Sequence, residues 1–241
     1  MALEVGKDTS NDWVSTNVPI SAYPFTFSCW YYYPSIPGST KCIFSFCDSG
    51  AANKINSVYT NSNDIYEYIN STGGGSTPNQ IGTGWWHFAW VARSTTDRSF
   101  FLDGTRYNHT TNLSLGTGSN NWTIGHFCDS TPSGHMGAGY YAAESGIWDV
   151  DLEDDEVEAL AGGLAPIGVR PGDLLRYWPM EHQETSSFRD KVSTDSAAIT
   201  GTLSHPITSH PMIHFPQPCF EIQEIEAAAA DSSALFMGCN F

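Results

Sequence analysis

Hydrophobic and polar side chains alternate with a period of two along residues 85–92, which read Trp-Trp-His-Phe-Ala-Trp-Val-Ala. Even-numbered residues of this run share one face of an expected strand, and odd-numbered residues share the other. Residues 100–105 read Phe-Phe-Leu-Asp-Gly-Thr. Asp103-Gly104 favours a tight hairpin turn because these residues tolerate positive φ. We therefore expect two strands that pair across a turn near residues 94–98, followed by a second chain reversal at Asp103-Gly104.

Other short runs predict further strands and one helix. The strands are expected at residues 25–33, 41–46, 58–69 (one or two strands), 122–125, 139–144 and 174–178. Since the run 41–46 follows a loop rich in Pro, Gly and Ser, we expect it to pair antiparallel with 25–33. Gly73-Gly74-Gly75 predicts a mobile loop. A helix is expected over residues 152–161, because its first turn is acidic and Gly162-Gly163 follows it.

These elements predict one sandwich over residues 1–200 and a separate segment after it. Four prolines punctuate residues 201–218, and residues 226–241 form an Ala-rich tail with an apolar end. An exposed apolar end is a liability unless a partner covers it. We therefore expect 201–241 to be a C-terminal arm for assembly or docking. Its expected contact residues are Phe215, Phe220, Leu235, Phe236 and Phe241.

Composition narrows the possible partners. The 241 residues are 40% hydrophobic and 13% aromatic, which is ample for a packed core. Ten basic residues stand against 26 acidic ones, so the net charge of −16 repels nucleic acid and anionic membrane surfaces. We expect neither partner. No run approaches a membrane span and the N-terminus has no secretory pattern, so we expect synthesis in a cytosol.

The six cysteines show no spacing typical of zinc sites or redox pairs. We interpret them as buried free thiols. One short repeat includes two of them, because residues 46–49 and 127–130 both read Phe-Cys-Asp-Ser.

The order of these motifs resembles the laminin G-like branch of the concanavalin A-like jelly rolls. The resemblance rests on Phe-Thr-Phe-Ser-Cys-Trp at 25–30, Trp-His-Phe-Ala at 86–89, Phe-Leu-Asp-Gly at 101–104, Ile-Gly at 124–125, Gly-Ile-Trp-Asp at 146–149, the helix near 152–160 and the strand near 174–180. It implies an all-β jelly-roll sandwich of two curved antiparallel sheets, with ligands at rim loops or on a concave face.

Many proteins of this kind bind calcium through loop carboxylates. Asp48 and Asp129, the third residues of the two Phe-Cys-Asp-Ser repeats, are the candidate ligands here. If the two strand ends are neighbours, both carboxylates lie on one rim and hold one Ca²⁺. No other cofactor is expected.

The segment Asp149-Val150-Asp151-Leu152-Glu153 has the acid-x-acid-x-acid spacing of family 16 glycoside hydrolases, which share this fold. Asp149 stands where that family has its Glu nucleophile. On a regular strand, residues 149 and 153 are roughly 13 Å apart, whereas a retaining pair needs about 5 Å. We interpret these acids as a solvated helix start and expect no catalysis. His87 has no identifiable nucleophile beside it and is interpreted as a packed or rim histidine.

Aromatic faces suit pyranose rings, so the run Trp30-Tyr31-Tyr32-Tyr33 is a candidate sugar platform. Tyr31 and Tyr33 are its candidate glycan-binding residues.

Two functions are compatible with these features. The first is a non-enzymatic structural or decoration protein of a phage virion, made in the host cytosol and docked on other virion proteins or on copies of itself through residues 201–241. The alternative is a glycan-binding adhesion module on a phage fibre or a cell surface. A family 16-like glycanase ranks third.

Overall fold

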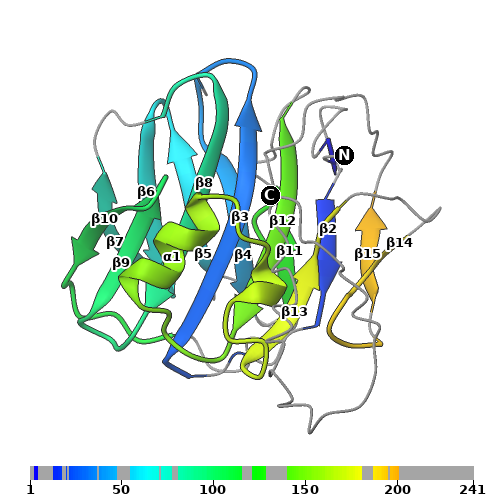
Figure 1. Ribbon diagram of the computed structural model, residues 1–241. Helices are drawn as coiled ribbons and strands as arrows, with labels where there is room; N and C mark the ends of the chain where they lie inside the picture. The colour runs from blue at the N-terminus through cyan, green and yellow to red at the C-terminus, as the bar shows by residue number, and fades with distance from the viewer. Residues whose placement is uncertain are drawn as a thin grey trace, which may run out of the picture.

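A computed structural model describes residues 3–4, 13–17, 20, 22–36, 38–47, 55–70, 72–77, 81–115, 121–128, 140–180, 187–194 and 196–200. Two antiparallel sheets pack face to face with one α-helix on the outside (Figure 1). This arrangement confirms the predicted all-β sandwich. Residues 201–241, with the five expected assembly residues, lie outside the described residues, so the docking arm stays a prediction.

The first sheet has seven strands in the order β1-β12-β3-β8-β9-β10, with β13 also paired to β12. The strands are β1 (Leu3–Glu4), β3 (Phe25–Tyr33), β8 (Gly84–Ala92), β9 (Arg98–Leu102), β10 (Thr105–His109), β12 (Tyr141–Trp148) and β13 (Leu174–Trp178).

The second sheet has eight strands in the order β14-β15-β2-β11-β4-β5-β6-β7. The strands are β2 (Trp13–Thr16), β4 (Lys41–Cys47), β5 (Ile55–Asn61), β6 (Asp64–Ile69), β7 (Thr72–Thr77), β11 (Asn121–Ile124), β14 (Ser187–Arg189) and β15 (Ser196–Thr200). The sequence patterns did not indicate β2, β14 or β15, which are short and carry little alternation.

The predicted hairpin is confirmed in β8 and β9, where Ala92 pairs with Arg98. The second reversal also occurs where expected, because Thr105 of β10 pairs with Leu102 of β9. Asp103 and Gly104 have φ values of 46° and 78°. Two consecutive positive values are typical of the type I′ turn that suits a twisted hairpin.

The predicted pairing of residues 25–33 with 41–46 is wrong, because β3 and β4 belong to different sheets. β3 lies between β12 and β8, and β4 lies between β11 and β5. The two strands instead face each other across the core, where the ring centroids of Phe27 and Phe44 are 3.9 Å apart. Tyr31 Oη also donates to the carbonyl of Ile43 at 2.5 Å. A loop between two runs does not reveal whether the chain turns within a sheet or crosses to the other one.

An ion pair joins the two sheets inside the core. Glu67 of β6 and Arg98 of β9 are both fully buried. Arg98 Nε donates to Glu67 Oε1 at 2.7 Å, and Arg98 Nη2 donates to Oε2 at 3.2 Å. Trp90 Nε1 of β8 donates to Oε1 at 3.0 Å, and His109 Nδ1 of β10 lies 3.4 Å from Oε2. Four strands from both sheets therefore converge on one carboxylate.

The surroundings of Glu67 favour its ionised form. Burial raises the pKa of Glu67, but hydrogen bonds from His109 and Arg98, together with their charges, outweigh burial and hold the pKa below its usual 4.5. Arg98 is satisfied on its other side by the carbonyls of Thr95 and Thr111. The charges are thus paired and hydrogen-bonded, as buried charges must be.

The glycine run 73–75 forms part of β7, so the mobile loop predicted there is wrong. A Cβ on Gly74 would clash with Glu67 Oε2, and a Cβ on Gly75 would lie 2.8 Å from His109 Nδ1. Side chains at these two positions are therefore excluded by Glu67 and His109, which lie below them. The glycines allow the backbone of β7 to close over the charged cluster.

The helix α1 (Asp154–Ala161) is followed by the short 3₁₀ helix η1 (Pro166–Gly168). The buried residues Val157 and Leu160 of α1 pack on Ala89 and Val91 of β8. The helix thus covers the outer face of the seven-stranded sheet (Figure 1). The backbone N–H of Glu153 donates to Glu156 Oε2 at 2.8 Å, which satisfies a donor at the helix start. The helix predicted at residues 152–161 is confirmed with a slightly later first residue.

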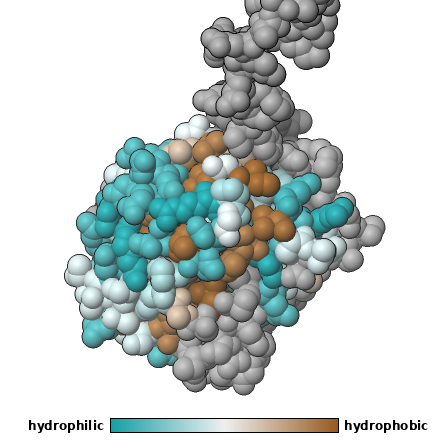
Figure 2. Space-filling model, turned by 60° about the horizontal axis from the view of Figure 1, so that its bottom comes forward, coloured by the Kyte–Doolittle hydropathy of each residue, from teal (hydrophilic) through white to brown (hydrophobic). Residues whose placement is uncertain are grey.

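The described surface is mostly hydrophilic on the side shown in Figure 2, with hydrophobic residues gathered in one band. Within the described ranges, the large apolar side chains that are more than a third exposed are Ile36, Ile167 and Val192. No helix in these ranges has the length and apolar character needed to cross a membrane.

We expect Glu67→Gln to destabilise the domain by about 3 kcal/mol, because it leaves the Arg98 guanidinium buried without a counter-charge. The control is Glu158→Gln, which changes an exposed glutamate on α1 and is expected to stay within about 0.5 kcal/mol of the parent. Denaturant unfolding at neutral pH measures both. Equal stabilities of the two variants would show that the ion pair is dispensable.

Candidate functional site

Three tyrosines lie side by side on the outer face of β5 and β6. Tyr59 of β5 pairs with Tyr66 of β6, and Tyr68 is two residues further along β6. Along β6 these partly exposed tyrosines alternate with buried residues, so their rings point away from the core. The rings of Tyr59 and Tyr66 stack with centroids 5.2 Å apart and an interplanar angle of 10°. Tyr68 meets Tyr59 edge-on at 6.5 Å.

Phe127 completes this surface from the other side of Tyr59. Its ring centroid lies 5.6 Å from that of Tyr59, in an edge-on arrangement. We call Tyr59, Tyr66, Tyr68 and Phe127 the tyrosine face. All four side chains are partly exposed.

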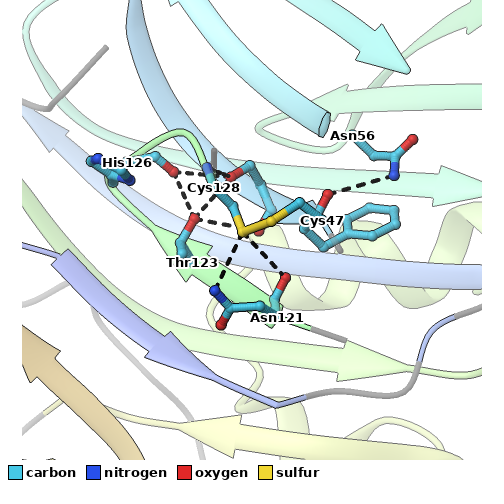
Figure 3. The surroundings of a disulfide bond; sticks show 8 residues. Cys47, Asn56, Asn121, Thr123, His126 and Cys128 are labelled. Atoms are coloured by element: carbon cyan, nitrogen blue, oxygen red, sulfur yellow. Dashed lines mark hydrogen bonds between the residues drawn. A yellow bond between two sulfur atoms is a disulfide. The ribbon is translucent and has the colours of Figure 1, made fainter. Parts of the chain in front are cut away.

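The residues on either side of Phe127 are fixed to the sheet. Ser45 Oγ of β4 donates to the carbonyl of His126 at 3.0 Å and accepts from the backbone N–H of Cys128 at 2.6 Å. Thr123 Oγ1 of β11 donates to the same His126 carbonyl at 2.6 Å (Figure 3). Phe127 is therefore held on both sides by short hydrogen bonds.

A disulfide adds a covalent attachment at this place. Cys47, the last residue of β4, is bonded to Cys128, with Cα atoms 5.7 Å apart (Figure 3). The expectation of free thiols is wrong for these two residues, because sequence spacing does not show that β4 and the chain after β11 are neighbours. Cys29 and Cys42 are free and buried, as predicted. Cys219 and Cys239 lie outside the described residues.

Polar groups border the tyrosine face at the turn between β5 and β6. The turn reads Asn-Ser-Asn-Asp over residues 61–64, and Ser62 has a φ of 57°. Tyr66 Oη donates to Asp64 Oδ2 at 3.2 Å. This hydrogen bond raises the pKa of Tyr66, and burial raises the pKa of Tyr59. Both phenols therefore stay protonated near neutral pH and can donate as well as accept hydrogen bonds.

The neighbouring edge strand leaves the tyrosine rings accessible. Gly73 of β7 pairs with Tyr68, and Ser76 pairs with Tyr66. A Cβ on Gly73 would meet no atom within 4 Å. Both residues are exposed and have small side chains, so β7 does not cover the neighbouring tyrosine rings.

The structure corrects the predicted sugar platform at residues 30–33. Tyr31 and Tyr33 are fully buried in the core, so they cannot stack on a ligand. The partly exposed members are Trp30 and Tyr32, which pack with Trp85 and Tyr141 on the outer face of the seven-stranded sheet. In a strand, alternate residues face opposite sides, and the odd-numbered residues of β3 are the ones that fill the core.

A protein-family model matches the sequence of this chain, in agreement with its fold. The family described as the concanavalin A-like lectin/glucanases superfamily (Laminin_G_3) matches residues 8–157 of the chain. The chain belongs to this superfamily. No curated protein matches the chain in a sequence search.

Several solved structures with this fold are similar to the chain, at low sequence identity. A heptameric SAP-like pentraxin from Limulus polyphemus is 17% identical with a TM-score of 0.54, over 66% of this chain and 81% of the pentraxin chain. A proposed carbohydrate binding protein from Bacteroides ovatus ATCC 8483 is 13% identical with a TM-score of 0.59; the match covers 85% of this chain and 59% of that one.

A third likeness is to the CBM40 of the Ruminococcus gnavus IT-sialidase. It is 15% identical with a TM-score of 0.52, over 66% of this chain and 98% of the CBM40. At identities this low, the structural similarity shows the shared fold alone. The site must therefore be argued from residues of this chain.

The candidate calcium ligands Asp48 and Asp129 lie outside the described residues, so that role stays a prediction. Cys47 and Cys128, which directly precede them, are joined by the disulfide. The two repeated strand ends are therefore neighbours, which is the condition that a shared site of Asp48 and Asp129 requires. In the described ranges, no group of three His, Cys, Asp or Glu side chains is arranged to hold a metal ion.

The acidic segment at residues 149–153 is not a strand. It connects the end of β12 to the start of α1. Asp151 Oδ2 lies 3.5 Å from Arg93 Nε, and Glu153 directly precedes the helix. Glu153 therefore belongs to the helix start, as interpreted, whereas Asp151 is paired with Arg93 rather than fully solvated.

His87 is a packed histidine. His87 Nε2 lies 2.8 Å from Ser28 Oγ, and both residues are 1% exposed. Its backbone N–H donates to Asp103 Oδ1 at 2.7 Å, which ties the hairpin turn to β8. Burial lowers the pKa of His87 to about 3, so its imidazole is neutral at physiological pH.

Sequence reasoning missed the tyrosine face, although one signal was present. Residues 65–69 read Ile-Tyr-Glu-Tyr-Ile, an alternation that places both tyrosines on one side of a strand. Phe127 gave no comparable signal, because its contact with Tyr59 depends on the fold.

We expect the double variant Cys47→Ser/Cys128→Ser to lose about 4 kcal/mol of unfolding free energy, because the disulfide closes a loop with a sequence separation of 81. Denaturant unfolding measures the loss. Treatment of the parent with dithiothreitol is the matched control and should reproduce the stability of the variant. A parent that is insensitive to reduction would contradict the bond.

We expect acid to destabilise the domain through His87. The unfolded state takes up a proton below about pH 6.5, whereas the folded state does so only near pH 3. Stability therefore falls as pH drops through this window, and His87→Gln should reduce the loss between about pH 7 and pH 4.5 by about 2–3 kcal/mol.

The control for this titration is Ser28→Ala, which removes the hydrogen bond and keeps the histidine. It should keep the parent's pH dependence, as measured by denaturant unfolding at both pH values. The same pH dependence in His87→Gln and the parent would exclude His87 as the source.

Proposed function

We propose that this domain is a non-catalytic glycan-binding module and that its ligand lies on the tyrosine face. The tyrosine face itself carries the proposal, because its partly exposed aromatic rings and their hydroxyl groups lie beside the Asp64 carboxylate. Rings stack on the apolar face of a pyranose, while polar groups at the border bind its hydroxyls.

The tyrosine face is held in place before a ligand arrives. Tyr59, Tyr66 and Tyr68 stand on paired strands, and Phe127 is fixed by hydrogen bonds and by the adjacent disulfide. A rigid surface loses little conformational entropy on binding, which favours affinity from a small number of contacts.

The comparisons support this class of function. The Bacteroides ovatus structure is described as that of a proposed carbohydrate binding protein, and a Ruminococcus gnavus CBM40 structure with a TM-score of 0.50 is bound to alpha2,3 sialyllactose. These proteins share the fold of the chain at identities below 25%. The assignment to this chain therefore rests on its own aromatic residues.

The predicted virion role has weaker support than glycan binding. It depends on the docking arm at residues 201–241, which lies outside the described residues, and none of the similar structures reported above is named as a virion protein. Homo-oligomer or virion partners stay predictions. A place on a phage fibre is compatible with glycan binding, since adhesion to a surface sugar is the alternative function expected from the sequence.

The disulfide indicates the redox surroundings in which such a module functions. Structural disulfides persist in oxidising surroundings such as the cell exterior. The Cys47–Cys128 bond thus supports action outside the reducing cytosol, where surface glycans are also found.

We expect Tyr66→Ala and Tyr68→Ala each to weaken glycan binding by about tenfold, because each removes a stacking ring worth about 1 kcal/mol or more. A glycan array identifies the ligand, and isothermal titration of that ligand measures the loss. Tyr66→Phe keeps the ring and should retain most of the affinity.

The matched control is Tyr32→Ala, which removes a partly exposed tyrosine from the other sheet. It should leave binding unchanged. If Tyr32→Ala abolished binding and Tyr66→Ala did not, the ligand would lie on the seven-stranded sheet. If no glycan bound to the parent, the proposed function would be wrong.

A further inference from the structure

We infer that the tyrosine face selects neutral saccharides and rejects acidic ones such as sialylated or sulfated sugars. This inference rests on the proposed function and adds the chemical class of the ligand. It comes from the distribution of charged side chains around the tyrosine face.

Acidic sugars present a carboxylate or sulfate, which proteins hold with arginine through paired hydrogen bonds. Five arginines of the described chain already pair with carboxylates. Arg93 is engaged by Asp151, Arg98 by Glu67, Arg106 by Asp154, Arg170 by Glu156 and Arg176 by Asp190. Their charge is therefore compensated within the domain.

Four of these arginines also lie away from the tyrosine face, and Arg98 is buried on the core side of β6 against Glu67. Arg93, Arg98, Arg106 and Arg176 belong to strands of the other sheet or to the turn between them, and Arg170 follows η1. Arg189 stands on β14, which is five strands from β5. At about 4.8 Å per strand, that separation is roughly 24 Å.

One lysine lies on the strands near these rings. Over the strands β4, β5, β6, β7 and β11, Lys41 is the basic residue that the structure describes. Lys41 is partly buried and pairs with Thr60, the residue after Tyr59. Its single ammonium lacks the paired donors with which an arginine holds a carboxylate or sulfate. Residues 48–54 and 116–120 lie outside this description.

The charged group in direct contact with the tyrosine face is a carboxylate. Asp64 accepts the hydrogen bond of Tyr66 and so stands beside the ring that a sugar would contact. A carboxylate accepts hydrogen bonds from sugar hydroxyls but repels an anionic substituent. The net charge of −16 adds long-range repulsion of the same sign.

The test compares matched pairs of sugars on the full chain. Each neutral oligosaccharide on an immobilised panel is accompanied by its sialylated or sulfated derivative, with lactose and α2,3-sialyllactose as one pair. The neutral member is expected to bind at least about tenfold more tightly than its acidic derivative. The ratio should shrink as salt is added, because salt screens the repulsion.

Three outcomes are distinguishable. Preferential binding of neutral members, lost in Tyr66→Ala, supports the inference. Equal or tighter binding of acidic members, also lost in Tyr66→Ala, overturns the neutral class and leaves the tyrosine face as a glycan site. Binding of no member overturns the proposed function and the inference with it.

A charge variant tests the cause of the selectivity. Asp64→Asn keeps the shape of the side chain and removes its charge, so the affinity for acidic members should rise about threefold while neutral members change little. Asp97→Asn is the matched control, because Asp97 is an exposed aspartate at the β8–β9 turn of the other sheet. An equal rise in both variants would assign the discrimination to overall charge and overturn the role of Asp64.

Discussion

The ion pair between Glu67 and Arg98 is the interaction on which the sandwich depends most, because it joins the two sheets inside an aromatic core. Glu67 also receives a hydrogen bond from Trp90 and has His109 beside it, so one carboxylate fixes the relative position of β6, β8, β9 and β10. The same strand β6 carries Tyr66 and Tyr68 on its opposite side. The buried charge and the exposed rings are thus alternate residues of one strand, and the inner contact sets the orientation of the outer surface.

Much of the fold could be predicted from local patterns. The alternation in residues 85–92 and the Asp-Gly turn at 103–104 fixed the hairpins of β8, β9 and β10, because turn chemistry and strand parity are local properties. The helix at 154–161 was also predictable from its acidic start. The pairing of strands was harder, since β3 and β4 are adjacent in sequence and yet lie in opposite sheets. Gly73-Gly74-Gly75 misled for a related reason: glycine marks a flexible loop in most contexts, but here it removes side chains that would collide with a buried carboxylate and imidazole.

The candidate site was less predictable than the fold. The aromatic run Trp30–Tyr33 suggested a surface that stacks on sugars. Neighbouring residues of a strand face opposite sides, so choosing the odd-numbered residues instead of the even-numbered ones exchanges the core face for the outer face. That single step places Tyr31 and Tyr33 in the core. Tyr59 and Phe127 meet only because β4 pairs with both β5 and β11. The disulfide depends on the same proximity, and the Phe-Cys-Asp-Ser repeat was its only trace in the sequence. Contacts between distant residues require the topology, which local periodicity does not contain.

The position of the disulfide has a consequence for the integrity of the chain. Cys47 and Cys128 enclose a continuous stretch that contains β5 to β11, including Glu67, Arg98 and all three tyrosines of the tyrosine face. A protease that cuts once inside this stretch produces two fragments that stay covalently joined. The inner ion pair and the paired strands can then hold both fragments in register. A surface built in this way tolerates a nick in the loops between its strands.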